Sequence, residues 1–398
     1  MSTNLAERMK NFQPSPTILL IGKVAELRKQ GKDIVSLNIG EPDFSTPDYI
    51  KVAGIKAITD NFTKYTPGAG IPELREQIVK KLERDNHITY AMNEVVVSVG
   101  AKQAISSAVM VTAGAGDEVI IPIPCWVSYA EMVRIAGAKP VFVPTRKDDF
   151  GLDLDAIRAA ITPRTKAIII CTPNNPTGAV YSEESLRELA VLAVEKDFFI
   201  ISDEIYEKLV YDGAGHFSVA SISEELRSRT ITINGVSKAY AMTGWRVGYA
   251  AGRADVIKGI SAVQSQLTSS TSAISQKAAA AALAGSEADM QHMVETFAER
   301  RNYVLMRLRA MPGVSCSNIK GAFYAYPNMQ AFLNKKYKGR HIGSTVNLCN
   351  YLLEEALIST VPGESYELPG YIRISYSNSM EQLKEGMDRL EKALLALE

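Results

Sequence analysis

The sequence predicts an α/β protein: a large domain whose mostly parallel sheet is covered by helices on both faces, and a smaller α+β domain built from both termini. At 398 residues the chain is too long for one small core. From about residue 90 to about 290, apolar runs of four to six residues alternate with amphipathic helical segments. This alternation is typical of parallel strands buried on both faces. Shorter strands and helices follow and predict the second domain.

The expected elements of the large domain follow one another closely, and each apolar run is rich in Val, Ile or Phe. In chain order we expect a strand at 94–100, a helix at 101–116, a strand at 117–124, a helix at 128–138, a strand at 139–145, a strand with its turn at 166–178, a helix at 183–197, and strands at 198–206, 229–238 and 246–252.

The second domain combines the two ends of the chain. One helix is expected at 18–31 and a long one through 290–311, followed by shorter elements at 321–328, 344–357 and 371–377. We therefore divide the chain into three parts: an N-terminal segment that packs with the small domain (1–45), a large cofactor-binding domain (46–290) and the small domain (291–398).

Charge and cysteine content argue against several classes of protein. Lys and Arg total 44, as do Asp and Glu, whereas binders of nucleic acid or anionic membranes carry a basic excess. The four cysteines lie far apart and form no CxxC pair, so we expect neither a disulfide framework nor a metal site. No apolar run resembles a signal peptide or reaches the roughly 18–20 residues of a membrane span. We expect a cytoplasmic protein.

Ligands of parallel sheets bind beyond the carboxyl ends of the strands, and four strand ends here carry polar residues. In SVGAKQA (98–104), Gly100 closes a strand and opens a helix, whose free amides suit a phosphate. An ordinary strand-to-helix turn explains the same residues. In TPNNPTG (172–178), Asn175 follows a strongly apolar strand and should face the crevice, although such residues also form plain loops.

The third strand end is FFIISDEIY (198–206), where Asp203 and Glu204 follow large apolar residues. A buried carboxylate needs a partner or takes up a proton. The alternative is that Ser202 and Asp203 cap a helix.

The fourth is NGVSKAYAMTGWRVG (234–248), which places Lys238 and Arg246 in a mostly apolar, half-buried setting. A lysine in apolar surroundings becomes available as a neutral amine nucleophile. Arg246 suits a phosphate or a carboxylate. Taken singly, Lys238 also fits a lysine whose ammonium group reaches the solvent.

Together these residues supply what pyridoxal phosphate requires: a lysine for a Schiff base, an acid for the pyridinium nitrogen, and an arginine with a helix N-terminus for the phosphate. The sequence resembles the fold-type-I pyridoxal-phosphate aminotransferases of class I, the aspartate aminotransferase family. SKAYAMTGWRVG looks like the lysine signature of that family, and NNPTG and SDEIY precede it in the expected order and spacing. The resemblance covers nearly the whole chain.

The resemblance implies a role for each matching residue. Lys238 would bind the cofactor and move the proton of the substrate α-carbon, and Asp203 would pair with the pyridinium nitrogen. Tyr206 and Asn175 would hydrogen-bond the phenolic oxygen of the cofactor from two sides. The phosphate would be held by Arg246 and Ser237 and by the helix start at Gly100, Ala101 and Lys102.

Four more residues match the family pattern. Trp126, in IPIPCWVSY, matches the aromatic that stacks on the cofactor ring, with a core tryptophan as the alternative; it and Asn175 would also border the substrate. Gly40 and Arg373 match the residues that hold the substrate α-carboxylate, the arginine through a bidentate pair. Tyr65 matches a tyrosine that reaches the cofactor phosphate of the neighbouring subunit, which implies a homodimer with shared active sites.

Two departures from the family concern phosphate and substrate binding. Many members have a phosphate-binding serine three residues before the lysine, where this chain has Gly235. In other members a second subunit binds the distal carboxylate of aspartate through an arginine, and the corresponding segment QSQLTSSTSAISQ (264–276) has no arginine. A bacterial branch that also lacks this arginine uses a lysine in a GGKQA-like turn with N-terminal hydroxyls. Lys102, Ser15 and Thr17 fit that branch, although Lys102 equally fits a solvated surface lysine.

We therefore expect an aminotransferase with ping-pong kinetics that takes the amino group of L-aspartate and passes it to 2-oxoglutarate. Transamination of aromatic amino acids or prephenate in the same site is the close alternative. A β-lyase or decarboxylase is a further one, because the choice of bond depends on substrate geometry. A nicotinamide-dependent dehydrogenase is excluded, because no glycine fingerprint follows a strand.

Overall fold

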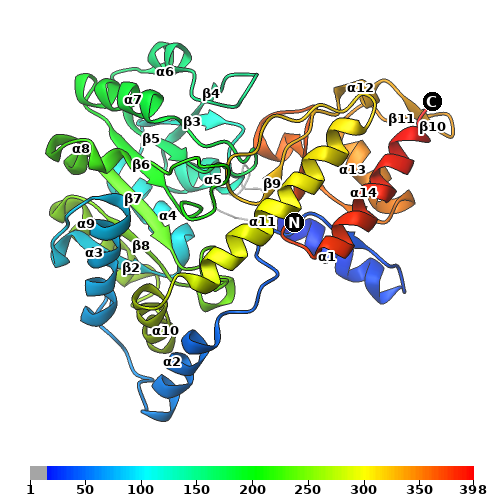
Figure 1. Cartoon of the computed structure of the whole chain (residues 1–398). Coiled ribbons are helices and arrows are strands. Elements are labelled where there is room, and N and C mark those ends of the chain that lie inside the picture. Colours follow the sequence, from blue (N-terminus) through cyan, green and yellow to red (C-terminus); the bar gives the residue numbers. More distant parts are fainter. Residues whose placement is uncertain (1–15) are drawn as a thin grey trace, which may run out of the picture.

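A seven-stranded sheet forms the centre of the larger of two lobes (Figure 1). The computed structural model of the chain describes residues 16–398, with side chains from residue 19 onward. The strand order is β2-β8-β7-β6-β5-β3-β4. The strands are β2 (Val95–Ser98), β3 (Glu118–Ile123), β4 (Lys139–Pro144), β5 (Thr165–Cys171), β6 (Phe199–Asp203), β7 (Thr230–Gly235) and β8 (Gly248–Ala251). Only β8 runs antiparallel to its neighbours, so the expected mostly parallel sheet is confirmed.

Helices cover both faces of this sheet, as the continuous apolar strands predict. Successive side chains of a strand point to opposite faces, so Ile168 and Ile200 pack under α6, α7 and α8, while Ile169 and Ile201 pack under α4, α5 and α9. The helices α2, α3 and α10 form a third apolar cluster with Val95 and other residues of β2 and β8. The large-lobe helices are α2 (Asp48–Thr59), α3 (Pro72–Asn86), α4 (Gly100–Thr112), α5 (Ser128–Ile135), α6 (Leu154–Ala160), α7 (Glu183–Glu195), α8 (Glu224–Arg229), α9 (Ala254–Leu267) and α10 (Ala273–Ala284).

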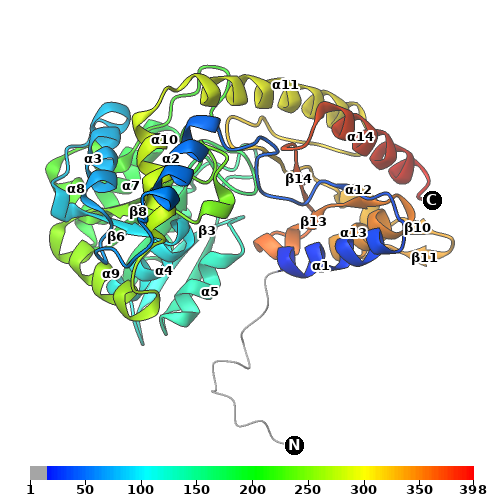
Figure 2. The ribbon, with the colours of Figure 1, turned by 90° about the horizontal axis from the view of Figure 1, so that it is seen from below.

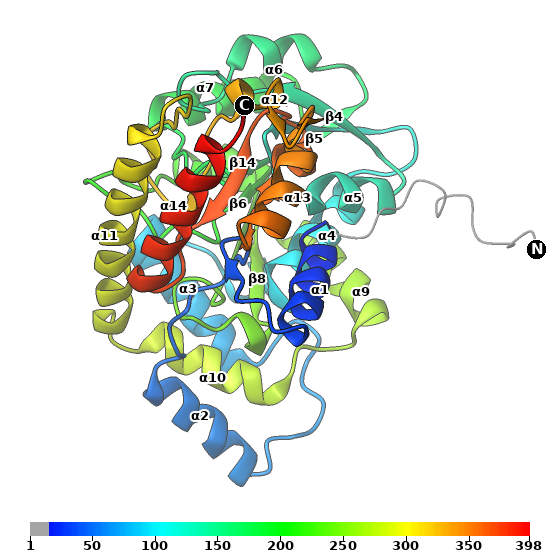
Figure 3. The same ribbon diagram turned by 90° about the vertical axis from the view of Figure 1, so that its right-hand side faces the viewer.

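The smaller lobe joins the two ends of the described chain. Its central sheet has the order β13-β14-β9, and β1 pairs in parallel with β12. The first helix, α1, lies beside α13 (Figures 2 and 3), where Lys23 forms an ion pair of 3.3 Å with Glu354. The elements are α1 (Pro16–Lys29), β1 (Val35–Ser36), α11 (Ala288–Ala310), β9 (Tyr324–Ala325), α12 (Gln330–Leu333), β10 (Lys336–Tyr337), β11 (Arg340–His341), α13 (Thr345–Glu355), β12 (Ile358–Ser359), β13 (Val361–Pro362), β14 (Ile372–Ser375) and α14 (Met380–Leu395).

The long helix α11 runs from one lobe to the other (Figure 1). The division expected between residues 290 and 291 therefore falls in the first turn of a continuous helix. We propose the same three-part organisation, with α11 as the shared element at the second boundary.

The topology brings polar strand ends from both lobes together. Cys171 and Asp203 are register partners at the carboxyl ends of β5 and β6. In the smaller lobe, Arg373 on β14 lies next to β9, where Tyr324 pairs with Ser375. None of the described helices has the length and hydropathy to cross a membrane.

Candidate active site

A cavity of about 360 Å³ lies where the strand ends of the two lobes meet. Most of the residues that the sequence singled out line it, including partly exposed Trp126, which is a wall residue rather than part of the core. The predicted residues on its wall are Gly40, Ala101, Lys102, Trp126, Asn175, Asp203, Tyr206, Ser237, Lys238, Arg246 and Arg373.

Lys238 presents its amine to this cavity. Its Nζ donates a hydrogen bond of 2.5 Å to the backbone oxygen of Gly40 and lies 5.8 Å from the centre of the Tyr206 ring. Burial lowers the pKa of Lys238 to about 8, and the positive charges of Arg373 and Arg246 act in the same direction. About a tenth of this amine is therefore neutral and nucleophilic at pH 7, far more than of a lysine with the ordinary pKa of 10.5.

Asp203 is a buried carboxylate without a described cationic partner at hydrogen-bond distance. Its Oδ2 accepts a hydrogen bond of 2.6 Å from Tyr129, and its Oδ1 accepts one of 3.2 Å from the backbone N–H of Ile205. Burial nevertheless raises the pKa of Asp203 to about 6. The helix-cap alternative is wrong, since a turn and not a helix follows β6 in the described chain.

The start of α4 and Arg246 form a cradle of positive potential. Among the described residues, Gln103 accepts from the backbone N–H of Val99, but no side chain accepts from the first amides of α4 itself, which remain free for an anion. Gly100 has a φ of +78°, and a Cβ there would lie 2.5 Å from Nη2 of Arg246. A Cβ on Gly248 would meet the backbone nitrogen of Ala101. Glycine at both positions lets the helix and the arginine approach each other.

Arg246 is exposed, which differs from the half-buried setting expected. It stands in the left-handed region with a φ of 57°, and its Nη1 donates to the backbone oxygen of Thr243 over 2.8 Å. This turn directs the charged group to the rim of the cavity and leaves it in contact with solvent.

The structure also explains the glycine three residues before the lysine. A Cβ at Gly235 would lie 2.8 Å from the backbone oxygen of Val247 and 2.9 Å from Cα of Gly248. A serine does not fit there unless β8 shifts. Ser237, two residues on, is buried against the cavity wall.

Arg373 is buried, and its two hydrogen bonds to described residues go to an amide side chain and a backbone oxygen, not to a carboxylate. Its Nη1 donates to Asn175 over 3.1 Å, and its Nη2 donates to the backbone oxygen of Asn38 over 2.7 Å. Its Nε has no partner among the described residues. Such an arginine is suited to bind a carboxylate from the cavity.

Lys102 is exposed, yet its ammonium group lies over the cavity. Nζ stands 4.9 Å from the centre of the Trp126 ring. Desolvation and the neighbouring charge of Arg246 lower the pKa of Lys102. Ser15, which was expected to assist Lys102, lies outside the described residues, as does the side chain of Thr17.

Tyr65 does not lie at this cavity. It is 93% exposed and lines a separate surface hollow together with Ser270, Thr271 and Ser272. The predicted partner-facing tyrosine and the segment noted for its missing arginine therefore share one stretch of surface.

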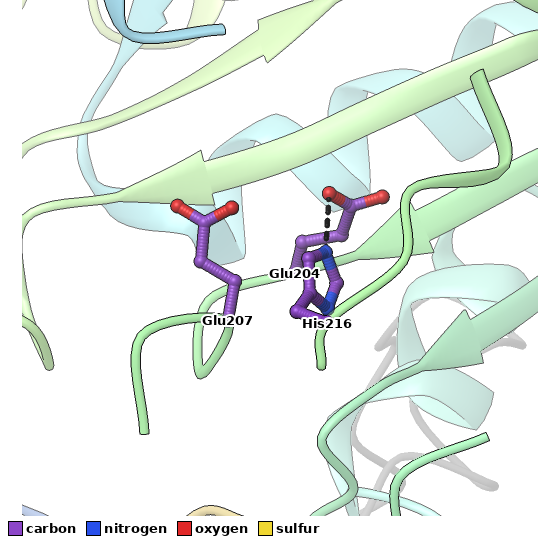
Figure 4. Close-up of side chains that lie close together, drawn as sticks. All are labelled: Glu204, Glu207 and His216. Atoms are coloured by element: carbon purple, nitrogen blue, oxygen red, sulfur yellow. Dashed lines mark hydrogen bonds and ion pairs between the residues drawn. The ribbon is translucent and has the colours of Figure 1, made fainter. Parts of the chain in front are cut away.

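A second polar cluster lies just after the end of β6. It includes Glu204, Glu207 and His216 (Figure 4). Glu204 accepts hydrogen bonds from Ser202, Ser218 and His216. The ammonium group of Lys81 pairs with Glu207. Lys81 thus supplies the positive charge that a metal ion would otherwise bring.

Sequence reasoning missed two residues that contact the predicted ones. Tyr129, which donates to Asp203, stands three residues after Trp126 in the first turn of α5. Tyr324 lies in GAFYAYPN, a strand-like segment without a motif, and its hydroxyl is 2.9 Å from that of Tyr206. Only the packing of distant segments reveals either contact.

The lining fits pyridoxal phosphate. The cradle of Gly100, Arg246 and Gly248 suits a phosphate, and the buried carboxylate of Asp203 suits a protonated ring nitrogen. Lys238 offers an amine for an aldehyde. Such an arrangement can bind the cofactor covalently and still leave Arg373 free for an acidic substrate.

Comparisons with known proteins agree with this chemistry. The family described as "Aminotransferase class I and II" matches residues 32–390. The chain is 42% identical to an aspartate aminotransferase of Bacillus sp. (strain YM-2), over 98% of this chain and 99% of the relative. It is 43% identical to a probable aspartate/prephenate aminotransferase of Aquifex aeolicus, over 99% of both chains.

Solved structures give the same result. The aspartate aminotransferase of Rhizobium meliloti superposes with a TM-score of 0.95 at 40% identity and full coverage of both chains. That of Thermus thermophilus with maleate superposes with a TM-score of 0.92 at 42% identity, over 98% of this chain and 99% of the other. The chain therefore belongs to the class I and II aminotransferases, enzymes that work with pyridoxal phosphate.

Proposed function

We propose that this aminotransferase moves the amino group of L-aspartate to 2-oxoglutarate by ping-pong chemistry. The observation that carries the proposal is the single cavity that joins Lys238, Asp203 and Arg373. It offers a nucleophilic amine, a buried acid and a buried guanidinium group. The relatives named as aspartate aminotransferases support this choice of donor.

The proposed roles at the cofactor follow from the charge and position of each side chain. Bound pyridoxal phosphate supplies an electron sink for the electron pair released at the substrate α-carbon. Lys238 holds the cofactor and then carries the α-proton, and Asp203 keeps a proton on the ring nitrogen. Tyr206 and Asn175 donate hydrogen bonds to the ring oxygen. Trp126 stacks on the ring, while Arg246, Ser237 and the start of α4 at Gly100, Ala101 and Lys102 hold the phosphate.

An ion pair with the ring nitrogen of the cofactor explains how Asp203 can stay a carboxylate at neutral pH. Burial raises its pKa to about 6 in the chain alone. A protonated ring nitrogen beside it favours the carboxylate form. The acid and the ring nitrogen therefore stabilise each other's charge at a buried position on the cavity wall.

The proposed substrate contacts begin with Arg373, which binds the α-carboxylate through its guanidinium group. Asn175 and the backbone of Gly40 border the same place. Lys102 binds the distal carboxylate of aspartate, as in the bacterial branch that lacks the intersubunit arginine. Its ammonium group lies over the Trp126 ring on the cavity wall. Desolvation lowers its pKa there, so it is a partly desolvated cation.

Aromatic or prephenate transamination is the second candidate, and one observation favours it. Several similar proteins are named aspartate/prephenate aminotransferases. Lys102 is exposed and can pair with a carboxylate or turn outward into solvent, so the same cavity can receive both classes of side chain.

We also propose a homodimer that shares its active sites. Val52, Ile55 and Ile58 on α2 are 60%, 59% and 53% exposed and follow one another at intervals of three residues, which puts them on one side of the helix. An apolar face of this kind is typical of an interface. Tyr65 follows α2 and would reach the phosphate in a second copy of the chain.

Substitution of Lys238 by alanine tests the proposed chemistry. The variant should fold and bind pyridoxal phosphate reversibly, and its turnover of aspartate with 2-oxoglutarate should vanish. Circular dichroism checks the fold, and sustained formation of glutamate checks turnover. Multiple turnovers in the variant would overturn the assignment of Lys238.

A further inference from the structure

Tyr324 touches three of the residues used in the proposed function. Its hydroxyl lies 2.9 Å from the hydroxyl of Tyr206. The guanidinium group of Arg373 stands 4.5 Å from the centre of its ring. A Cβ at Gly40 would lie 2.8 Å from its hydroxyl. Tyr324 is buried and lines the same cavity.

The contact with Tyr206 crosses from one lobe to the other. Tyr206 follows β6 in the larger lobe, whereas Tyr324 lies on β9 in the smaller one. β9 pairs with β14, the strand that carries Arg373. The hydrogen bond between the two phenols therefore connects the side chain proposed for the cofactor oxygen with the strand proposed for the substrate carboxylate.

Hydrogen-bond counting fixes the direction of this bond when Tyr206 serves the cofactor. A phenol has one proton to donate. Burial raises the pKa of both Tyr206 and Tyr324, so both keep their protons. If Tyr206 donates its proton to the ring oxygen of the cofactor, its own oxygen must accept from Tyr324.

We propose that Tyr324 is a positioning residue for the transamination, whose hydroxyl donates to Tyr206 and strengthens the hydrogen bond that Tyr206 makes to the cofactor oxygen. The inference rests on the proposed roles of Tyr206 and Arg373. Successive hydrogen bonds polarise one another, so a phenol that accepts one bond donates the next more strongly. The ring of Tyr324 also makes a cation–π contact with the guanidinium group of Arg373.

Tyr324→Phe tests the inference, because it removes the hydroxyl and keeps the ring under Arg373. The readout is the pH midpoint at which the absorption band of the lysine-bound cofactor changes. Hydrogen bonds to the ring oxygen favour the neutral form of the attached lysine nitrogen, so their weakening raises this midpoint. We expect Tyr324→Phe to raise it by about half a pH unit and Tyr206→Phe by about one unit or more.

The double variant decides whether the two hydroxyls act in series. Tyr206→Phe/Tyr324→Phe should have the same midpoint as Tyr206→Phe, because the second hydroxyl acts only through the first. The matched control is Tyr366→Phe. Tyr366 is also fully buried beside Arg373, at 5.4 Å, and its hydroxyl has no partner among the described residues. Its midpoint should equal that of the wild type.

Two outcomes would overturn the inference and leave the proposed function intact. In one, Tyr206→Phe raises the midpoint and Tyr324→Phe does not. In the other, the effects of the two substitutions add in the double variant. If Tyr206→Phe itself leaves the midpoint unchanged, the proposed role of Tyr206 fails and the inference about Tyr324 fails with it.

Discussion

At the scale of single residues, burial makes Lys238 and Asp203 reactive. It lowers the pKa of the lysine to about 8 and raises that of the aspartate to about 6. Both shifts favour the neutral form of the group, which is the general effect of removing a charge from water. The lysine thereby becomes a nucleophile. The carboxylate of the aspartate is destabilised by burial, and a cationic partner would stabilise it.

Asp203→Asn should stabilise the cofactor-free protein at pH 8. With a folded pKa near 6, above the ordinary 3.8, the folded chain binds more protons than the unfolded chain between these values. Its stability therefore falls as the pH rises from about 4 to about 6, by up to roughly 3 kcal/mol, and the loss persists at pH 8. Asparagine carries no charge and avoids this loss.

Urea unfolding of the two cofactor-free proteins at pH 8 measures the difference. The same experiment with pyridoxal phosphate should reverse the order, because only the carboxylate pairs with a charged ring nitrogen. A cofactor-free variant less stable than the wild type would contradict the account, since it would mean that Asp203 already has a cationic partner.

Lys102→Ala should lower kcat/KM for aspartate by about 10-fold or more, the loss expected for one charge-assisted hydrogen bond. The value for phenylalanine should change little, because its ring has no distal carboxylate to pair. Lys258→Ala on α9 is the matched control, since Lys258 is exposed and lies away from the cavity. Equal losses for both substrates would assign Lys102 to the cofactor phosphate or the fold.

At the scale of elements, the end of β6 lies between the cavity and the polar cluster of Glu204, Glu207 and His216. Asp203 faces the cavity, and Glu204 faces the cluster with Glu207, His216 and Lys81. Burial alone would raise the pKa of Glu207, but the charges of Lys81 and His216 hold it below its usual value. The cluster thus fixes the turn after β6 to α3, which carries Lys81.

Lys81→Met should destabilise the protein by about 3–5 kcal/mol, because it leaves the buried carboxylate of Glu207 without its cation. Denaturant unfolding checks this value. The double variant Lys81→Met/Glu207→Gln should recover much of the loss, because it removes both charges together. A single variant as stable as the wild type would show that water already reaches Glu207.

The sequence predicted the elements and residues that depend on local signals. The apolar run of β5 predicted a strand buried on both faces. The polar residues at the strand ends, such as Asn175 after β5, together with Lys238 predicted the cofactor. It did not predict α2, α3, α6, α8, α9 and α10, which lie in stretches where no element was expected. Nor did it predict the contact of Tyr129 with Asp203 or of Tyr324 with Tyr206, because these pairs are 74 and 118 residues apart in the chain.

At the scale of the whole molecule, the proposed active site takes residues from two copies of the chain. The exposed apolar side of α2 and the position of Tyr65 away from its own cavity support this arrangement. In a two-fold dimer each copy gives the same residue to the other. Lys238 and Tyr65 of one chain would then serve different sites.

Heterodimers of Lys238→Ala and Tyr65→Ala chains test the sharing of sites. One site receives both substitutions, and the other receives neither. A heterodimer purified through two different tags should therefore have about half of the wild-type activity, while each homodimeric variant has little. A heterodimer as inactive as the two homodimers would contradict the shared site.

The most direct test of the central claim is the half-reaction with L-aspartate alone. The purified enzyme, loaded with pyridoxal phosphate and given no 2-oxo acid, is followed by its absorption spectrum and by assay of oxaloacetate. We predict that the band of the lysine-bound cofactor disappears and that about one oxaloacetate forms per site, because the amino group stays on the enzyme. An unchanged band without oxaloacetate would remove aspartate as the donor, and with it the proposed role of Lys102.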